Sequence, residues 1–166
     1  MTGAHEVQTY FQDRAIAAAV ERALPDDQRL LLLRDRELLV GAAAHFSEQG
    51  PSDRSGGSFQ RRLAAYATAL HVQGGKLSTG EYASKALLRA VVSDITSRHS
   101  PRDLVILTAL VLPMNKPSRT CLERYGWAVA GQQKAYLVYA NSLLVAQNAL
   151  GVDPSPDIDA FHEPGT

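Results

Sequence analysis

Apolar residues in the first half of the chain follow helical spacing once and strand spacing three times. Residues 16–24 carry apolar side chains at i, i+3, i+4, i+7 and i+8, the pattern of one helix face, and Pro25 ends it. The alternating or continuous apolar runs that follow predict strands at 30–33, 38–46 and 63–72. A polar turn at 34–37 separates the first two strands, and a loop rich in glycine and serine at 50–58 precedes the third.

The second half alternates helices with strands. An amphipathic helix is predicted over 83–98, followed by a strand at 104–111 whose nearly continuous apolar run suits burial on both faces. A short helix from Asn115 to Tyr125 has Pro117 in its first turn and Gly126 after its end. Strands at 127–130 and 135–139, joined by residues 131–133, and a helix at 141–150 complete the pattern.

This order of elements predicts a single α/β (α+β) domain over residues 1–150. Consecutive strands with short turns favour antiparallel pairing, whereas a crossover through the 83–98 helix makes its two flanking strands parallel. The sheet is therefore expected to be mixed and mostly antiparallel. Residues 151–166, rich in proline, aspartate and glycine, are expected to form a disordered tail.

Composition narrows the possible functions. The 17 basic and 17 acidic residues balance, so neither nucleic acid nor an anionic membrane is an expected partner. No apolar run approaches the roughly 20 residues of a membrane span, and the first residues lack the pattern of a signal peptide, so a cytoplasmic protein is expected. Cys121 is the only cysteine, and the histidines are scattered, so no disulfide and no metal site are predicted.

One loop between a strand and a helix could bind an anion. Residues 78–83 read S-T-G-E-Y-A and lead into the 83–98 helix. The first N–H groups of a helix have no partner within it, and together with the helix dipole they favour phosphate groups. A second interpretation stays open, because Ser78 and Glu81 have the spacing of a capping box, in which these side chains would satisfy the helix start themselves.

Strand, phosphate loop, helix, strand and an N-x-x-S helix ending in Gly-Trp resemble the GNAT superfamily of acyl-CoA-dependent N-acyltransferases. The resemblance is best over residues 63–139. It implies helices on both faces of the sheet, and acetyl-CoA as the acyl donor without a metal. It also implies a cofactor site built from the end of the third strand, the loop and the later helix, with these residues: Leu70, His71 and Val72 (backbone), Ser78, Thr79, Gly80, Glu81, Tyr82, Ala83 and Asn115.

The sequence departs from the family pattern at three positions. Ser78 stands where the family loop has Gln or Arg, and Glu81 stands where its first glycine belongs. A carboxylate beside two phosphates is repulsive. Leu122 matches the tyrosine that protonates the departing thiolate in many members. Asn115 also has a simpler interpretation, since an asparagine before a helix is a common cap.

Acyl transfer to an amine requires a group that removes a proton from the amine. Histidine suits this role near neutral pH. His71 on the third predicted strand and His45 on its neighbour are the candidate bases, and Tyr66, on the opposite face of the third strand from His71, is the third catalytic candidate.

Two functions are consistent with these residues. The first is an N-acetyltransferase that moves an acetyl or related acyl group from acyl-CoA to an amine, either a small molecule or a protein. The second is a non-catalytic domain of the same fold that has lost affinity for acyl-CoA. The short region before the sheet leaves little material for an acceptor pocket, so either the acceptor is large or the pocket forms in a homodimer.

Overall fold

The structure is a computed structural model that describes residues 28–47, 58–68 and 75–154. The predicted helix at 16–24 lies outside the described residues, as do nearly all of the loop at 50–58, the end of the third predicted strand and most of the tail.

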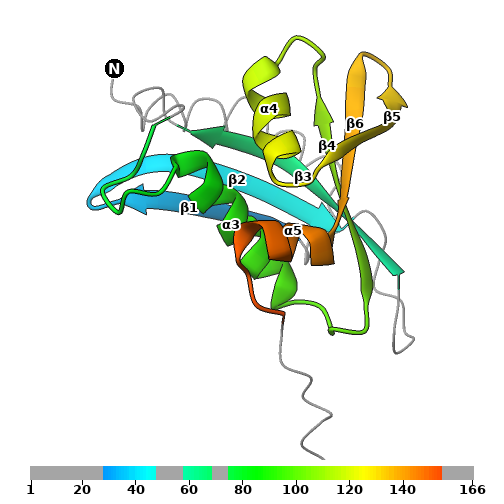
Figure 1. Ribbon diagram of the computed structural model, residues 1–166, viewed down its shortest axis with the longest axis horizontal. Helices are drawn as coiled ribbons and strands as arrows, with labels where there is room; N and C mark the ends of the chain where they lie inside the picture. The colour runs from blue at the N-terminus through cyan, green and yellow to red at the C-terminus, as the bar shows by residue number, and fades with distance from the viewer. Residues whose placement is uncertain (1–27, 48–57, 69–74, 155–166) are drawn as a thin grey trace, which may run out of the picture.

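In the described residues, six strands form one sheet in the order β1-β2-β3-β4-β6-β5 (Figure 1). Their bounds are Arg29–Asp35 (β1), Leu38–Ser47 (β2), Ser58–Thr68 (β3), Leu104–Val111 (β4), Ala128–Gln133 (β5) and Tyr136–Ser142 (β6). Every neighbouring pair is antiparallel except β3 and β4, which are parallel. The mixed, mostly antiparallel sheet predicted from the sequence is confirmed, and its parallel pair is the one that flanks the crossover helix.

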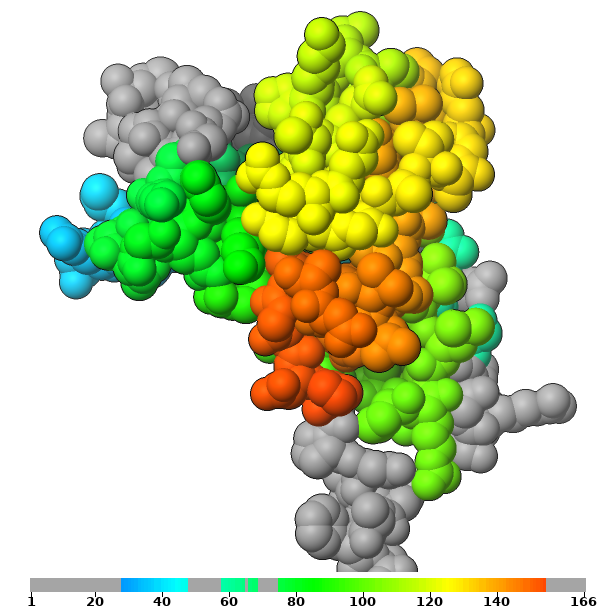
Figure 2. All heavy atoms as spheres, viewed as in Figure 1, coloured from blue at the N-terminus to red at the C-terminus, as the bar shows by residue number. Residues whose placement is uncertain are grey.

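The described helices are α3 (Ala83–Thr96), α4 (Lys116–Arg124) and α5 (Leu143–Leu150). Ser142 caps α5 by accepting the Val145 N–H at 3.2 Å, and Gly151, with φ of 67°, ends it. In Figure 2 the surfaces of α3, α4 and α5 adjoin on one side of the molecule. Helices on the other face of the sheet remain an expectation, because the residues before 28 lie outside the described structure.

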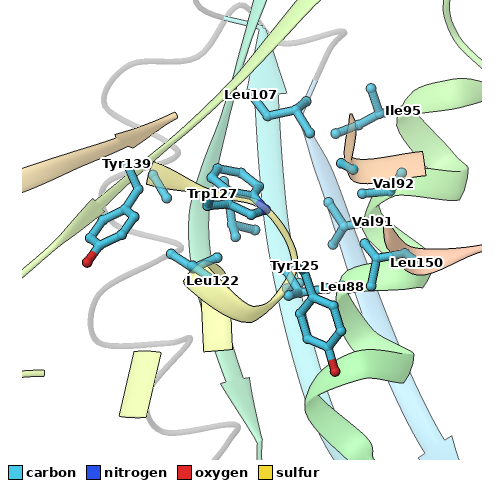
Figure 3. Packing of buried hydrophobic residues seen from close by; sticks show 14 of the residues in the cluster. Leu88, Val91, Val92, Ile95, Leu107, Leu122, Tyr125, Trp127, Tyr139 and Leu150 are labelled. Atoms are coloured by element: carbon cyan, nitrogen blue, oxygen red, sulfur yellow. The ribbon is translucent and has the colours of Figure 1, made fainter. Parts of the chain in front are cut away.

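One apolar core joins these helices to the sheet. Buried side chains of α3 face those of β4 and of the segment after α4 (Figure 3), and the residues labelled there are Leu88, Val91, Val92, Ile95, Leu107, Leu122, Tyr125, Trp127, Tyr139 and Leu150. A smaller cluster around Val40, Leu77 and Ala83 packs the start of α3 against β2. Together they fix α3 along its length.

Several strand boundaries differ from the prediction, among them the end of β1 at Asp35, the end of β6 at Ser142, the start of β3 and the end of β5. β3 begins at Ser58 rather than Leu63, because the polar segment before Leu63 pairs with β2 and β4, and the buried Arg61 donates a 2.7 Å hydrogen bond to His99. Residues 131–133 belong to β5, and the chain reverses at Lys134 and Ala135 instead, where Lys134 has φ of 53°. Apolar periodicity could not show the start of β3 or the end of β5, since both segments are polar.

Candidate functional site

The parallel strands β3 and β4 part before they end. Their pairing runs from Ser58 beside Leu104 to Leu63 beside Ala109. Beyond that point β3 continues beside β2 as far as Thr68, whereas β4 continues beside β6 as far as Val111. Within the described residues the facing edges of the two strand ends therefore lack each other as partners. We call this place the strand parting.

Helix α3 starts near the strand parting with free backbone donors. Its N-cap residue is Tyr82, whose side chain makes no capping hydrogen bond. The Ala83 N–H is bonded to the Gly75 carbonyl at 3.1 Å, but within the described residues the N–H groups of Ser84 and Lys85 have no partner. Two unbonded donors at a helix start are suited to an anion.

The loop before α3 holds its own shape. The Leu77 N–H bonds the Glu81 carbonyl at 2.7 Å, and the Gly80 N–H bonds the Leu77 carbonyl at 2.9 Å. A β-bridge joins Lys76 to Tyr82. Gly80 has φ of 86° and nothing within 4 Å of the position a Cβ would take, so the loop is open to solvent there. Thr79 is also exposed.

The two acidic groups at this loop bind different partners. The Ser78 N–H donates to the Asp35 carboxylate at 2.8 Å, and the Ser78 hydroxyl donates to the other carboxylate oxygen. These hydrogen bonds hold the pKa of Asp35 below its usual value. Glu81 forms a bidentate ion pair with Arg89, in which Nη2 of Arg89 donates to Oε2 of Glu81 at 2.6 Å.

The capping-box interpretation is therefore wrong. Helix α3 begins five residues after Ser78 and one after Tyr82, which is its N-cap residue, so neither Ser78 nor Glu81 is placed to cap it. Arg89 attracts the Glu81 carboxylate to the outside of α3, and Asp35 takes the donors of Ser78. Neither side chain therefore accepts a hydrogen bond from the Ser84 or Lys85 N–H group at the start of α3.

Tyr66 connects α3 and α4 at the strand parting. Its hydroxyl donates to the Ser84 carbonyl in the first turn of α3 at 3.0 Å and lies 3.4 Å from Sγ of Cys121 on α4. Burial, with a smaller contribution from Cys121, raises the pKa of Tyr66, so the hydroxyl keeps its proton at neutral pH. Leu122, which matches the family's tyrosine, is 4% exposed and packs in the core.

Asn115 caps α4, as its simpler interpretation predicts. Its side-chain oxygen accepts the Ser118 N–H at 3.3 Å. It lies six residues, about 9 Å of helix, from Cys121. The structure thus brings Tyr66, Cys121 and the start of α3 together, with Asn115 farther along α4.

His45 lies elsewhere. It is 1% exposed, and its Nε2 is 2.8 Å from the carboxylate of Asp94, about 16 Å of helix beyond the first residue of α3. Burial lowers the pKa of His45 to about 4. The structure does not bring His45 to the strand parting. Leu70, His71 and Val72 lie outside the described residues, and their roles stay predictions.

Sequence reasoning missed Asp35 and Arg89. Asp35 reaches Ser78 only because the β1–β2 turn folds onto a loop 43 residues later, which no local pattern reveals. Arg89 is two helical turns beyond Glu81, and this spacing was the only available signal.

One hollow lies apart from this site, and metal-binding clusters and membrane-spanning helices are absent from the described residues. A hollow of about 200 Å³ at the opposite end of α3 is lined by residues that include His99, Asp103 and Leu144. In the described part of the chain, no group of three or more histidine, cysteine or acidic residues could hold a metal. None of the described helices is long and apolar enough to cross a membrane.

Known structures share this fold at low sequence identity. The N-acyl amino acid synthase FeeM from uncultured soil microbes has a TM-score of 0.57 and 12% identity, over 89% of this chain and 92% of its own. The N-acetyltransferase PaiA of Thermoplasma acidophilum, in complex with coenzyme A, has a TM-score of 0.53 and 11% identity, over 81% and 73%. The N-acetyltransferase PseH of Campylobacter jejuni has a TM-score of 0.52 and 9% identity, over 86% and 95%.

No protein-family model and no curated protein matches the sequence. The likeness is one of architecture, and it confirms the predicted fold: the chain has the fold of the GNAT acyltransferases.

Proposed function

We propose that this protein is an N-acyltransferase that takes an acetyl or related acyl group from acyl-CoA and passes it to an amine. The observation that carries this proposal is the parting of β3 and β4 beside a helix whose Ser84 and Lys85 N–H groups have no partner among the described residues. PaiA, which has this fold, is described in complex with coenzyme A.

The residues at the start of α3 fit the chemistry of a pyrophosphate. The N–H groups of Ser84 and Lys85 point out of the helix start without partners in the described structure, and Gly80 leaves room for close approach. Acyl-CoA, when bound, supplies the activated acyl group. The chain would hold its phosphates at α3, and the strand parting would receive its acyl arm.

Tyr66 is the described residue best placed to act on the reacting end. Its protonated hydroxyl lies between α3 and α4, and it would donate to a sulfur or carbonyl oxygen of the substrate by giving up its hydrogen bond to the Ser84 carbonyl. The base that accepts the amine proton stays a sequence prediction at His71, which lies outside the described residues. Positioning alone also accelerates acyl transfer, so this family of reactions does not depend wholly on a base.

The binding experiment compares melting temperatures with and without ligand. CoA and acetyl-CoA should raise the melting temperature at millimolar concentration, because a ligand of the native state stabilises it. Pantetheine, which lacks the pyrophosphate, should raise it less. A bulky substitution, Gly80→Leu, should reduce the shift, whereas Gly131→Leu on β5, where space is equally open, should leave it unchanged.

Activity is then measured as thiol release from acetyl-CoA in the presence of a panel of amines. Acetyl-CoA binding together with acceptor-dependent release supports the enzyme. Tyr66→Phe should lower the rate while leaving the affinity for CoA within about twofold, since it removes only a hydroxyl.

The second candidate function is a non-catalytic module of the same fold. The burial of Leu122 favours it, because Leu122 occupies the position that the resemblance gives to the tyrosine that protonates the departing thiolate. Absence of any thermal shift with CoA at millimolar concentration would favour this candidate over the enzyme.

The effect of Glu81 provides a further test of the loop. Glu81 lies in the loop before α3, where its carboxylate would repel the proposed phosphates, and its ion pair neutralises the guanidinium of Arg89. Glu81→Gly should therefore tighten CoA binding, by freeing Arg89 and removing the acid. Weaker binding would show that the loop is used differently.

A further inference from the structure

The loop before α3 already has an anion bound to it, and that anion belongs to the chain. Asp35, the last residue of β1, places one carboxylate oxygen 2.8 Å from the Ser78 nitrogen and the other against the Ser78 hydroxyl. The tight turn after Asp35 fixes its direction, since Arg36 has φ of 55° and Asp35 pairs with Leu38 across the turn.

We propose that Asp35 is a built-in competitor for the loop: its carboxylate occupies the donors of Ser78 until a ligand's phosphate displaces it. This inference rests on the proposed function, since it concerns the same loop. It assigns to the β1–β2 turn a direct influence on the affinity for phosphate-bearing ligands.

Asp35 is not needed to shape the loop. The loop's form is set by its own backbone bonds, from Leu77 to Glu81, from Gly80 to Leu77 and from Ala83 to Gly75, and by the Lys76–Tyr82 bridge. Removing the carboxylate would therefore free the Ser78 donors without changing the conformation of the loop. If Asp35 served only to hold the loop in shape, the loop would depend on the Asp35–Ser78 hydrogen bonds for its conformation.

Displacement of Asp35 leaves no buried charge behind. The side chain is partly exposed, so a released carboxylate is hydrated by solvent at once. A ligand phosphate in its place would gain the Ser78 N–H and hydroxyl, and the loop of Ser78 leads into α3, where the N–H groups of Ser84 and Lys85 have no partner among the described residues. A fixed negative charge at Ser78 opposes that phosphate both by occupying the donors and by repulsion.

The experiment compares two charge-removing substitutions in one turn. Asp35→Asn retains the shape of the side chain and removes its charge, and Glu37→Gln removes the same charge two residues away, at an exposed side chain, whereas the Ser78 donors are bonded to Asp35. Binding of CoA and of inorganic pyrophosphate is measured by calorimetry, and melting temperatures establish that each variant is folded. Asp35→Ala serves as a second variant that removes the acceptor oxygens as well.

Asp35→Asn should bind CoA about three- to tenfold more tightly than the wild type, with Asp35→Ala at least as tight, and Glu37→Gln should change affinity by less than about twofold. A variant that binds where the wild type does not also supports the inference. Equal affinity of Asp35→Asn and Glu37→Gln, or weaker binding by the Asp35 variants, overturns it while leaving the proposed function intact. Failure of every protein to bind CoA or pyrophosphate overturns both.

Discussion

The buried ring of His45 is expected to lower the unfolding free energy of the protein in mild acid. Its ring is buried, its Nε2 bonds Asp94, and the nearby positive charges of Arg61 and Arg98 oppose a second charge there. Burial lowers the pKa of His45 to about 4, against 6.5 in an unfolded chain. Asp94 partly offsets this effect, and its own pKa falls to about 2, because hydrogen bonds from Arg29, His45 and Arg98 outweigh its burial.

The sign follows from proton binding. As the pH falls through 6.5, the unfolded chain protonates its histidine, whereas the folded protein does not until about pH 4. The stability is therefore fully present above pH 6.5 and is lost between pH 6.5 and 4. The two pKa values correspond to about 2 kcal/mol lost between pH 7 and pH 5.

Urea denaturation at pH 7 and pH 5 measures this loss, and a variant isolates it. His45→Gln keeps a nitrogen that can donate to Asp94 but does not titrate, so its unfolding free energy should change by about 2 kcal/mol less over the same interval. If wild type and His45→Gln lose the same stability between the two pH values, the burial argument is wrong. A greater loss in the variant would mean that the protonated ring is stabilised by Asp94.

Three further tests by substitution concern the packing and the Asn115 cap. Gly126→Ala should cost about 2 kcal/mol, because φ is 90° and the new methyl would lie 2.9 Å from Cγ1 of Val145; a cost under about 0.5 kcal/mol in urea denaturation would contradict the packing. Asn115→Ala should lower the unfolding free energy by about 1 kcal/mol, and Asn115→Asp should recover most of it, since aspartate also caps. Leu87→Ala, at 0% exposure, should cost about 3 kcal/mol and Leu144→Ala, at 64%, less than about 0.5 kcal/mol, and similar melting temperatures for the two would refute the assigned core.

The sheet and its one parallel pair could be predicted from the sequence, because burial imposes a period on apolar residues and a crossover helix has a preferred connection. The start of β3 could not, because Arg61 is buried by a partner, His99, that lies 38 residues away. Where polar residues occupy the interior of a strand, the sequence lacks the alternation of apolar and polar residues from which a strand is predicted.

The candidate site was predictable only in part. The loop and the start of α3 follow from local signals, and so does the Asn115 cap. The partners of Ser78, Glu81 and Tyr66 do not, because each bond depends on which side chains the completed fold brings within 3 Å or so. The capping box failed for the same reason, since Arg89 and Asp35 attracted its two members elsewhere.

The strand parting divides the sheet into two three-stranded units, β1-β2-β3 and β4-β6-β5, that share a ladder of only six residue pairs. Each unit keeps its own antiparallel bonds if the distance between the free strand ends changes. Opening or narrowing there is therefore a hinge movement about the paired end, and it breaks none of the hydrogen bonds that hold either unit together.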